Sequence, residues 1–240
     1  MIGIIGGNGV AATNRLLALV ERKYTLGGAF RDCHHPEMII WQATQAPSRS
    51  MYLEGRGPSW IEDYVKVGKK LKECGCTELC MCCNTAHYAI DLLEKEIGLP
   101  FINLLNEVAK RAKELKCRRV GMMCTDGLRK EKIYDKYFSM IAPEVEVIYP
   151  SDEGQRLVTK GICNAKNINR FLDCANPEHP ASSFTAVCHE LVSMNVDCII
   201  GGCTDISNVF FYDGGENIRY IDSLDVLADA IVSETKNIQK

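Results

Sequence analysis

The chain has 240 residues, of which 46% are hydrophobic and 25% charged, and its formal net charge at pH 7 is −3. These values are typical of a soluble globular protein, and the small negative charge argues against a surface built for nucleic acid or acidic membranes. No apolar run approaches the roughly 18 residues of a membrane span, and the first residues lack the charged start of a secretory signal. The sequence therefore predicts a cytoplasmic protein with no nucleic-acid or membrane partner.

The predicted elements follow a regular order along the chain. Short apolar runs alternate with longer amphipathic stretches, which is typical of βαβ units and a parallel sheet. Strands are predicted at 1–5, 38–43, 78–82, 100–103, 119–124, 145–149, 197–201 and 218–221. Helices are predicted at 10–25, 59–74, 85–97, 104–116, 128–141, 165–174, 181–194 and 223–237. The chain is therefore assigned to the α/β class.

The chain also contains an internal repeat. Residues 2–9 align with 120–127 at an offset of 118, and residues 64–85 align without a gap with 184–205 at an offset of 120. In both copies of the longer segment a predicted helix leads into a buried strand, and a cysteine follows the end of that strand. This order of elements favours a duplication, and chance recurrence of βα units is the alternative.

The repeat predicts two pseudo-symmetric lobes, each a parallel sheet flanked by helices. Lobe one is expected at 1–99 plus 209–240 and lobe two at 100–208. Ligands bind outside the carboxyl ends of parallel strands, so the active site is expected in the cleft between the lobes. Cys83 and Cys203 take the same place in the repeat, and each lobe would present one of them to this cleft.

Two thiols on opposite sides of one small substrate suit proton transfer at a carbon centre. One thiolate removes a proton from one face, and the other thiol delivers a proton to the opposite face. Both cysteines precede predicted helices or turns, whose N-terminal ends stabilise a thiolate. A redox pair remains an alternative. The paired spacings of zinc sites are absent among the 13 cysteines, so no metal is expected.

The glycine-rich start "GIIGGNG" does not have the G-x-G-x-x-G spacing of a dinucleotide loop. No acidic residue ends the second predicted strand, which also argues against a nucleotide cofactor. The glycines instead allow the backbone to approach a small anionic substrate, with Asn8 as a polar contact. His87, one helical turn after Cys83, is expected to support the fold rather than to act on the substrate.

In each lobe one cation follows the second predicted strand. Arg49 lies in "QAPSRS" and Lys160 in "SDEGQRLVTKG", 111 positions apart. If each lobe directs one cation at the cleft, the substrate carries two carboxylates, as aspartate and glutamate do. Solvated loop cations are the alternative.

These motifs resemble a known family. "GGNG", "PSRS", "CCNTAH", "TKG" and "GGCTD", in this order over nearly the whole chain, resemble the aspartate/glutamate racemase superfamily and most of all its aspartate racemase branch. The resemblance implies a cofactor-independent amino-acid racemase in which Cys83 and Cys203 are the two acid/base thiols. It also implies a small dicarboxylic amino-acid substrate and, because members are commonly dimers, a homodimer.

The resemblance also assigns substrate-binding residues. Asn84, Thr85 and Thr204 would bind the α-carboxylate and the amino end of the substrate. Arg49 and Lys160 would bind carboxylates, including that of the side chain. Thr125 matches a family threonine that opens the first loop of the second lobe.

Several positions depart from the aspartate racemase pattern. Val10, Ser48, Asp205 and Leu128 stand where Pro, Asp, Glu and Thr are usual, and the G-C-T-H of glutamate racemases is absent. The first prediction is a racemase of aspartate, with glutamate as a further substrate. The alternatives are a maleate cis–trans isomerase, a hydantoin racemase, a non-catalytic amino-acid-binding paralogue and a thiol redox protein.

Overall fold

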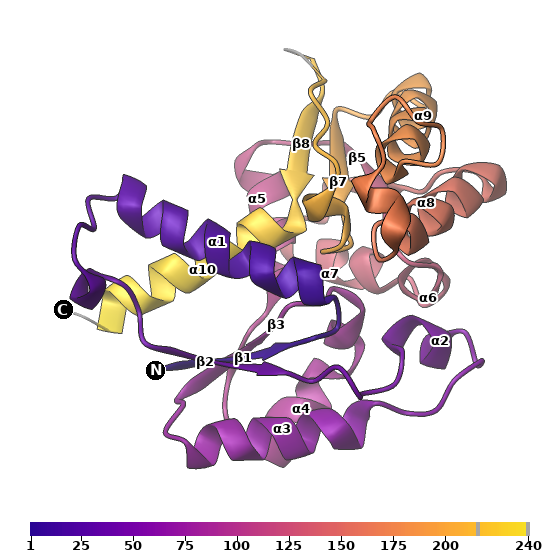
Figure 1. The fold of residues 1–240 in the computed structure, drawn as a ribbon. Coiled ribbons are helices and arrows are strands. Elements are labelled where there is room, and N and C mark those ends of the chain that lie inside the picture. Colours follow the sequence, from indigo (N-terminus) through magenta and orange to yellow (C-terminus); the bar gives the residue numbers. More distant parts are fainter. Residues whose placement is uncertain (215–216, 239–240) are drawn as a thin grey trace.

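The computed structural model describes residues 1–214 and 217–238, and its strands form two parallel sheets of four strands each (Figure 1). The first sheet, in the order β2-β1-β3-β4, comprises β1 (Ile2–Gly6), β2 (Met38–Gln42), β3 (Glu78–Met81) and β4 (Phe101–Ile102). The second, in the order β6-β5-β7-β8, comprises β5 (Arg119–Met123), β6 (Glu146–Ile148), β7 (Cys198–Gly201) and β8 (Arg219–Asp222). The predicted α/β class with two similar lobes is confirmed.

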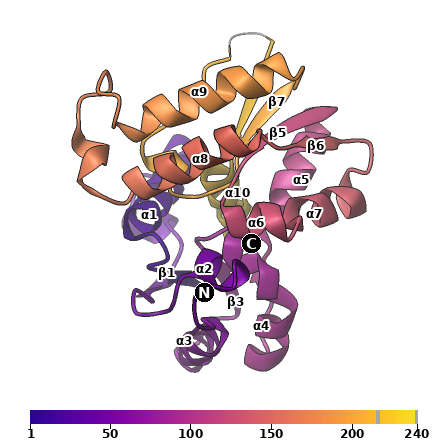
Figure 2. The same ribbon diagram turned by 90° about the vertical axis from the view of Figure 1, so that its right-hand side faces the viewer.

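The longer helices cover both faces of each sheet (Figures 1 and 2). They are α1 (Val10–Leu26), α2 (Arg49–Leu53), α3 (Ile61–Glu73), α4 (Ile90–Ile97), α5 (Leu104–Glu114), α6 (Asp126–Lys130), α7 (Ile133–Ile141), α8 (Asp152–Asn164), α9 (Pro180–Ser193) and α10 (Ser223–Ile238). The short 3₁₀ turns are η1 (Asp32–His34), η2 (Thr85–Ala89), η3 (Ile168–Phe171) and η4 (Ile206–Asn208). Within the described ranges, none of these helices is both long and apolar enough to cross a bilayer.

The strand register supports the predicted repeat. In the first sheet Ile2 pairs with Glu78, and in the second Val120 pairs with Cys198. These partners are related by the same offsets of 118 and 120 that align the two halves of the sequence. The two sheets therefore match in strand order and in register, which places the loops after β3 and β7 at equivalent positions.

Each lobe has one outer core, and the two lobes share a third. Alternate residues of β1 separate these clusters: Ile5 packs with α3 and α4, whereas Ile4 packs with α1 and α10. The second sheet packs α8 and α9 on its outer face. Its inner face belongs to the same cluster as Ile4, so one continuous apolar core joins the lobes.

The lobe boundaries differ from the predicted ones by one strand at each crossing. β4 pairs with β3 in the first sheet, and β8 pairs with β7 in the second. Boundaries at 1–99 plus 209–240 and 100–208 would detach both strands, because in each lobe the chain lays its fourth strand beside the third before it crosses over. Residues 215–216 and 239–240 lie outside the described part of the chain.

After β8 the chain returns towards lobe one. Helix α10 lies beside α1 (Figure 1), and Lys23 Nζ is 2.9 Å from Asp225 Oδ1 and 2.8 Å from Asp229 Oδ1. Two ion pairs therefore connect the last helix to the first.

Two helices, the short α2 and the longer α8, were not predicted, and one predicted helix is wrong. Residues 152–164 form α8, whereas the helix expected at 165–174 is only the 3₁₀ turn η3. The polar sequence of α8 concealed its narrow apolar face, on which Val158 and Ile162 are buried. The helix expected at 128–141 is also two helices, α6 and α7, because Lys132 between them has a left-handed φ of 47°.

Candidate active site

Cys83 and Cys203 line one small cavity between the lobes, with a volume of about 50 Å³. Each follows the carboxyl end of the third strand of its sheet, and the two residues are 9% and 8% exposed. The cavity is called the two-cysteine cavity below. Eight of the nine predicted site residues line it: Asn8, Arg49, Cys83, Asn84, Thr85, Thr125, Cys203 and Thr204.

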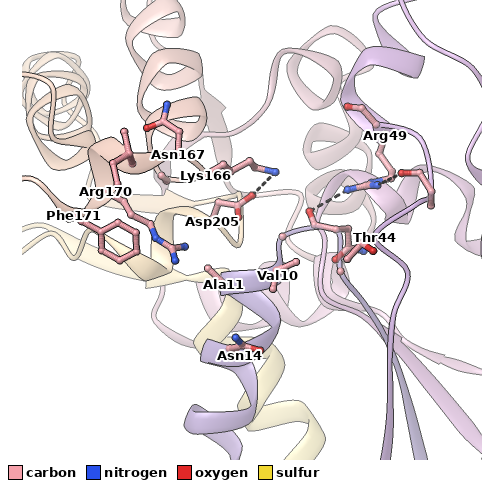
Figure 3. A pocket seen from close by; sticks show the side chains of 17 residues that line it. Val10, Ala11, Asn14, Thr44, Arg49, Lys166, Asn167, Arg170, Phe171 and Asp205 are labelled. Carbon is pink, nitrogen blue, oxygen red and sulfur yellow. Dashed lines mark hydrogen bonds and ion pairs between the residues drawn. The ribbon is translucent and has the colours of Figure 1, made fainter.

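Lys160 is not among the residues that line this cavity, so the prediction that it faces the cleft is wrong. It lies on α8, and its Nζ is 2.8 Å from Glu178 Oε1, with both side chains about half exposed. Lys166, just beyond α8, lines the cavity instead, with its Nζ 2.8 Å from Asp205 Oδ2 (Figure 3). Lys166 lies 117 positions after Arg49, which is closer to the repeat offset of 118 to 120 than the 111 positions of Lys160. The repeat therefore favoured Lys166 as the equivalent cation.

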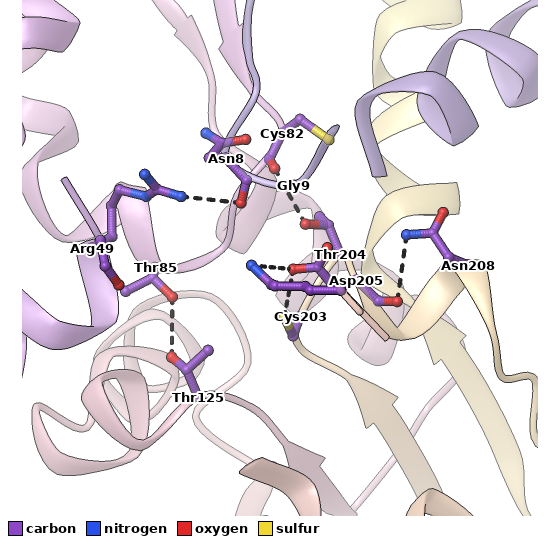
Figure 4. A network of polar contacts seen from close by, with 12 residues as sticks. Asn8, Gly9, Arg49, Cys82, Thr85, Thr125, Cys203, Thr204, Asp205 and Asn208 are labelled. Atoms are coloured by element: carbon purple, nitrogen blue, oxygen red, sulfur yellow. Dashed lines mark hydrogen bonds and ion pairs between the residues drawn. The ribbon is translucent and has the colours of Figure 1, made fainter. Parts of the chain in front are cut away.

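Arg49 is held in place by backbone carbonyls. Its Nη1 donates to Pro47 O at 2.9 Å and its Nη2 donates to Asn8 O at 3.0 Å (Figure 4). Burial lowers the pKa of Arg49, but the neighbouring Cys83 and Tyr64 raise it by more than burial lowers it. The pKa of Arg49 therefore lies above its usual value. The buried Nε has no hydrogen-bond partner among the described residues. A fixed positive charge therefore stands beside Cys83.

Cys203 lies beside an acid rather than a base. Its Sγ is 3.9 Å from Asp205 Oδ2. Burial raises the pKa of Cys203, the negative charge of Asp205 raises it further, and Lys166 opposes the shift only in part. Cys203 is therefore a protonated thiol at neutral pH.

Asn8 lines the cavity, and its side chain has an unpaired buried acceptor. Its Nδ2 donates to Tyr64 Oη at 2.5 Å, whereas its buried Oδ1 has no donor within the part of the chain that the structure describes. The preceding Gly7 has a φ of 79°, and a Cβ there would lie 2.6 Å from Ala43 N. Only glycine fits this turn, which sets the position of Asn8.

Other predicted side chains bond across the lobes. These hydrogen bonds join Thr85 Oγ1 to Thr125 Oγ1 (3.0 Å), Thr204 Oγ1 to Cys82 O (3.2 Å) and Asn84 Nδ2 to Ser223 Oγ (3.0 Å). Asn84 Oδ1 also accepts from Tyr134 Oη. Both ends of the Asn84 amide are therefore bonded within the protein, and sequence motifs could not show this because its partners lie 50 and 139 positions away.

His87 orients the loop that carries Cys83. Its Nδ1 is 2.9 Å from Cys83 O, and its Nε2 accepts from Leu104 N at 3.1 Å. A ring that accepts at Nε2 is neutral and donates from Nδ1. Burial lowers the pKa of His87 to about 4, so this form persists at neutral pH. The residue supports the cysteine loop, as its place one helical turn after Cys83 predicts.

Comparison with known proteins places this arrangement in a family. Residues 2–231 match the family described as Asp/Glu/Hydantoin racemase. The chain belongs to this family.

Two relatives illustrate its range. This member of the racemase family is 25% identical, over 97% of both chains, to the "Broad specificity amino-acid racemase RacX" of Bacillus subtilis (strain 168). Its fold is similar to that of Picrophilus torridus aspartate racemase, with a TM-score of 0.78 and 23% identity over 98% of this chain and 94% of that one.

The fold is also similar to that of glutamate racemase isoform RacE1 from Bacillus anthracis, with a TM-score of 0.65. The identity there is 17%, over 99% of this chain and 82% of the other. These structural matches share the fold of the racemase described here. Within residues 1–214 and 217–238, no group of three or more His, Cys, Asp or Glu side chains is arranged to hold a metal ion.

Proposed function

We propose that the protein racemises a dicarboxylic amino acid, with aspartate as the first candidate and glutamate as the second, and that it uses no cofactor. One observation carries this proposal: Cys83 and Cys203 reach the same cavity from equivalent positions of two repeated lobes. Membership of the racemase family supports the reaction class. Two cations at the cavity, Arg49 and Lys166, support an acidic substrate.

The unequal surroundings of the two thiols assign their resting roles. The guanidinium of Arg49 stabilises negative charge on the Cys83 sulfur, so Cys83 is the base. Cys203, whose pKa is raised by burial and by Asp205, is the acid. The family chemistry needs one thiolate and one thiol, and the proposal gives the first role to the cysteine beside the cation and the second to the cysteine beside the acid.

The reaction then proceeds by two proton transfers at the α-carbon. The Cα–H bond breaks as its proton moves to the Cys83 sulfur, and the electron pair is delocalised into the α-carboxylate. The Cys203 thiol gives its proton to the opposite face of the same carbon, which inverts the centre. Cys83 is then a thiol and Cys203 a thiolate, and proton exchange with solvent, or reaction of the opposite enantiomer, restores the starting state.

The protein lowers the barrier by placing charge in a site with little water. Lys166 Nζ and Arg49 lie at the cavity where negative charge develops on the substrate carboxylates. Both cysteines are less than a tenth exposed, which strengthens these electrostatic contacts.

The test is isotope exchange with inversion. L-Aspartate, D-aspartate and both forms of glutamate would be incubated separately in D₂O and resolved by chiral chromatography with mass detection. We expect deuterium at Cα of the opposite enantiomer, and a loss of inversion of at least about 10³-fold in Cys83→Ala and Cys203→Ala. Cys74→Ser, an exposed cysteine outside the cavity, is the matched control.

Each result has a definite meaning. Inversion that survives either alanine variant contradicts the two-thiol mechanism. A wild-type protein that exchanges neither aspartate nor glutamate contradicts the proposed substrate class.

A further inference from the structure

The two-cysteine cavity is smaller than a whole dicarboxylic amino acid. Its volume of about 50 Å³ has room for about four water molecules, at about 10–15 Å³ for each. The α-carbon with its amino and carboxyl groups accounts for that space. The side chain of the substrate must therefore extend out of the cavity.

Two larger hollows adjoin the cavity. The vestibule, with a volume of about 660 Å³, shares Asn8, Ser48, Arg49, Lys166 and Asp205 with it. The groove, with a volume of about 300 Å³, shares Ser48, Ser50, Thr125, Ile162 and Lys166 with the cavity. Either hollow could receive the side chain, and their charges differ.

The groove is close to electrically balanced. Two acids, Glu54 and Asp126, and two bases, Arg56 and Lys166, line it beside apolar side chains such as Met51. Its acids are already bonded within the protein. Glu54 accepts from Ser50 and Arg56, and Asp126 accepts from Gln155 and Thr159. An additional carboxylate has no free cation to meet there.

The vestibule is positive. Arg49, Lys166 and Arg170 line it, and its single acid, Asp205, is already paired with Lys166. Figure 3 shows Arg170 and Arg49 reaching into this hollow from opposite sides. Arg170 lies 4.4 Å from the centre of the Phe171 ring, and within the described part of the chain no carboxylate pairs with it. Its guanidinium is available to an anion.

The start of helix α1 adds to the positive electrostatic potential of the vestibule. Helix α1 begins there at Val10 and Ala11, and its first turn contains no acidic residue. The N-terminal end of a helix carries partial positive charge. Asn8 lines both the vestibule and the cavity, and its side-chain amide is held in place by Tyr64.

We infer that the substrate side chain leaves the cavity through the vestibule, and that Arg170 binds the terminal carboxylate of side chains longer than that of aspartate. The ligand class is α-amino dicarboxylic acids of the length of glutamate and 2-aminoadipate. The shorter side chain of aspartate ends at the mouth of the cavity, near Arg49 and Lys166. This inference rests on the proposed function, because it takes the α-carbon to lie between the two cysteines.

The test measures binding, so it does not require turnover. Succinate, glutarate and adipate match the carbon chains of aspartate, glutamate and 2-aminoadipate but lack the amino group. Their dissociation constants would be measured calorimetrically for the wild type, Arg170→Met and Arg170→Lys. Arg56→Met, which removes a cation from the groove, is the matched control. Loss of a hydrogen-bonded charge pair predicts adipate binding about 10-fold weaker in Arg170→Met.

The outcomes separate the inference from the proposed function. We expect succinate binding to change less than about 2-fold in Arg170→Met, and Arg170→Lys to recover part of the adipate affinity. An equal loss for all three acids, a loss in Arg56→Met but not in Arg170→Met, or no adipate binding by the wild type overturns the inference. Arg170-dependent adipate binding without any racemisation instead contradicts only the proposed function.

Discussion

The two lobes repeat one sheet, yet the cysteines that follow their third strands have neighbours of opposite charge. Cys83 has the guanidinium of Arg49 beside it, whereas Cys203 has the carboxylate of Asp205 3.9 Å away, itself paired with Lys166. The repeat places the two sulfurs symmetrically, and the residues around them make the sulfurs chemically different. Two acid/base groups are useful in one turnover only when one is charged and the other is not.

A second difference lies one turn beyond each cysteine. His87 of lobe one corresponds to Ser207 of lobe two, 120 positions later. His87 accepts from Leu104 N at the start of α5, and Ser207 donates to Asp222, which accepts from Leu224 N at the start of α10. Both residues connect the cysteine loop to the helix after the fourth strand. The titratable group is a histidine in lobe one, where burial lowers its pKa to about 4, and a carboxyl in lobe two, where burial raises the pKa of Asp222.

After the cysteine variants, the largest effect is expected at the cations of lobe two. Lys166→Met removes a charge at the cavity and is expected to lower kcat/KM for aspartate by about 10- to 100-fold, the range for a hydrogen bond to a charged group. Lys160→Met breaks only an exposed ion pair and is expected to change it less than about 2-fold. Lys166→Arg keeps the charge and should retain more activity than Lys166→Met. Equal losses in the two methionine variants would restore the original assignment of Lys160.

The next effect concerns the stability of lobe one. Burial lowers the pKa of His87 from 6.5 to about 4. Between these two pH values the unfolded chain binds a proton at His87, whereas the folded protein does not. The free energy of unfolding should therefore fall as the pH falls, by about 2 kcal/mol between pH 7 and pH 5 from this residue. Urea unfolding at both pH values should show a smaller fall in His87→Gln. His189→Gln, an exposed histidine on α9, is the control. Identical falls in the wild type and His87→Gln would contradict this account.

The smallest effect is a displacement of the pH profile. Asp205→Asn removes the negative charge that raises the pKa of Cys203, so that pKa should drop. When Cys203 acts as the acid, kcat/KM declines as its thiol ionises, and this decline should move about one unit toward lower pH. Glu178→Gln removes an acid that pairs with Lys160 outside the cavity and should leave the profile unchanged. A profile that Asp205→Asn does not move would show that the two cysteines differ for another reason.

The central strands were predictable because they are short, apolar and buried. β1, β3, β5 and β7 carry almost uninterrupted hydrophobic residues, as central strands of a parallel sheet do. The helix α8 was not predicted, because most of its residues are polar and only a narrow stripe meets the core. A stripe of that kind can be recognised only when the surface it packs against is known.

The site was predictable where a motif fixes a residue next to a strand end. Cys83, Asn84 and Thr85 follow β3 directly, so their arrival at the cavity needs only the sheet. Lys166 depends on where α8 ends, and the missed helix led to the choice of Lys160. The ties of Asn84 to Tyr134 and Ser223 depend on how the two lobes meet, which no local pattern contains.

The contacts on the two sides of the cavity have unequal costs of separation. Behind it, the lobes share an apolar core that includes Ile4 and Met122. In front, α2 meets α6 through hydrogen bonds as well as apolar contact. Lys130 Nζ donates to Leu53 O at 2.9 Å and Gly127 N donates to Ser50 Oγ at 3.4 Å, while the side chains of Leu53 and Leu128 are buried. Water can replace each of these bonds at little net cost, whereas exposure of the core is costly. These hydrogen bonds therefore add less to the cost of separating the lobes than the shared core does, and it is mainly the core that keeps the two sulfurs at one cavity.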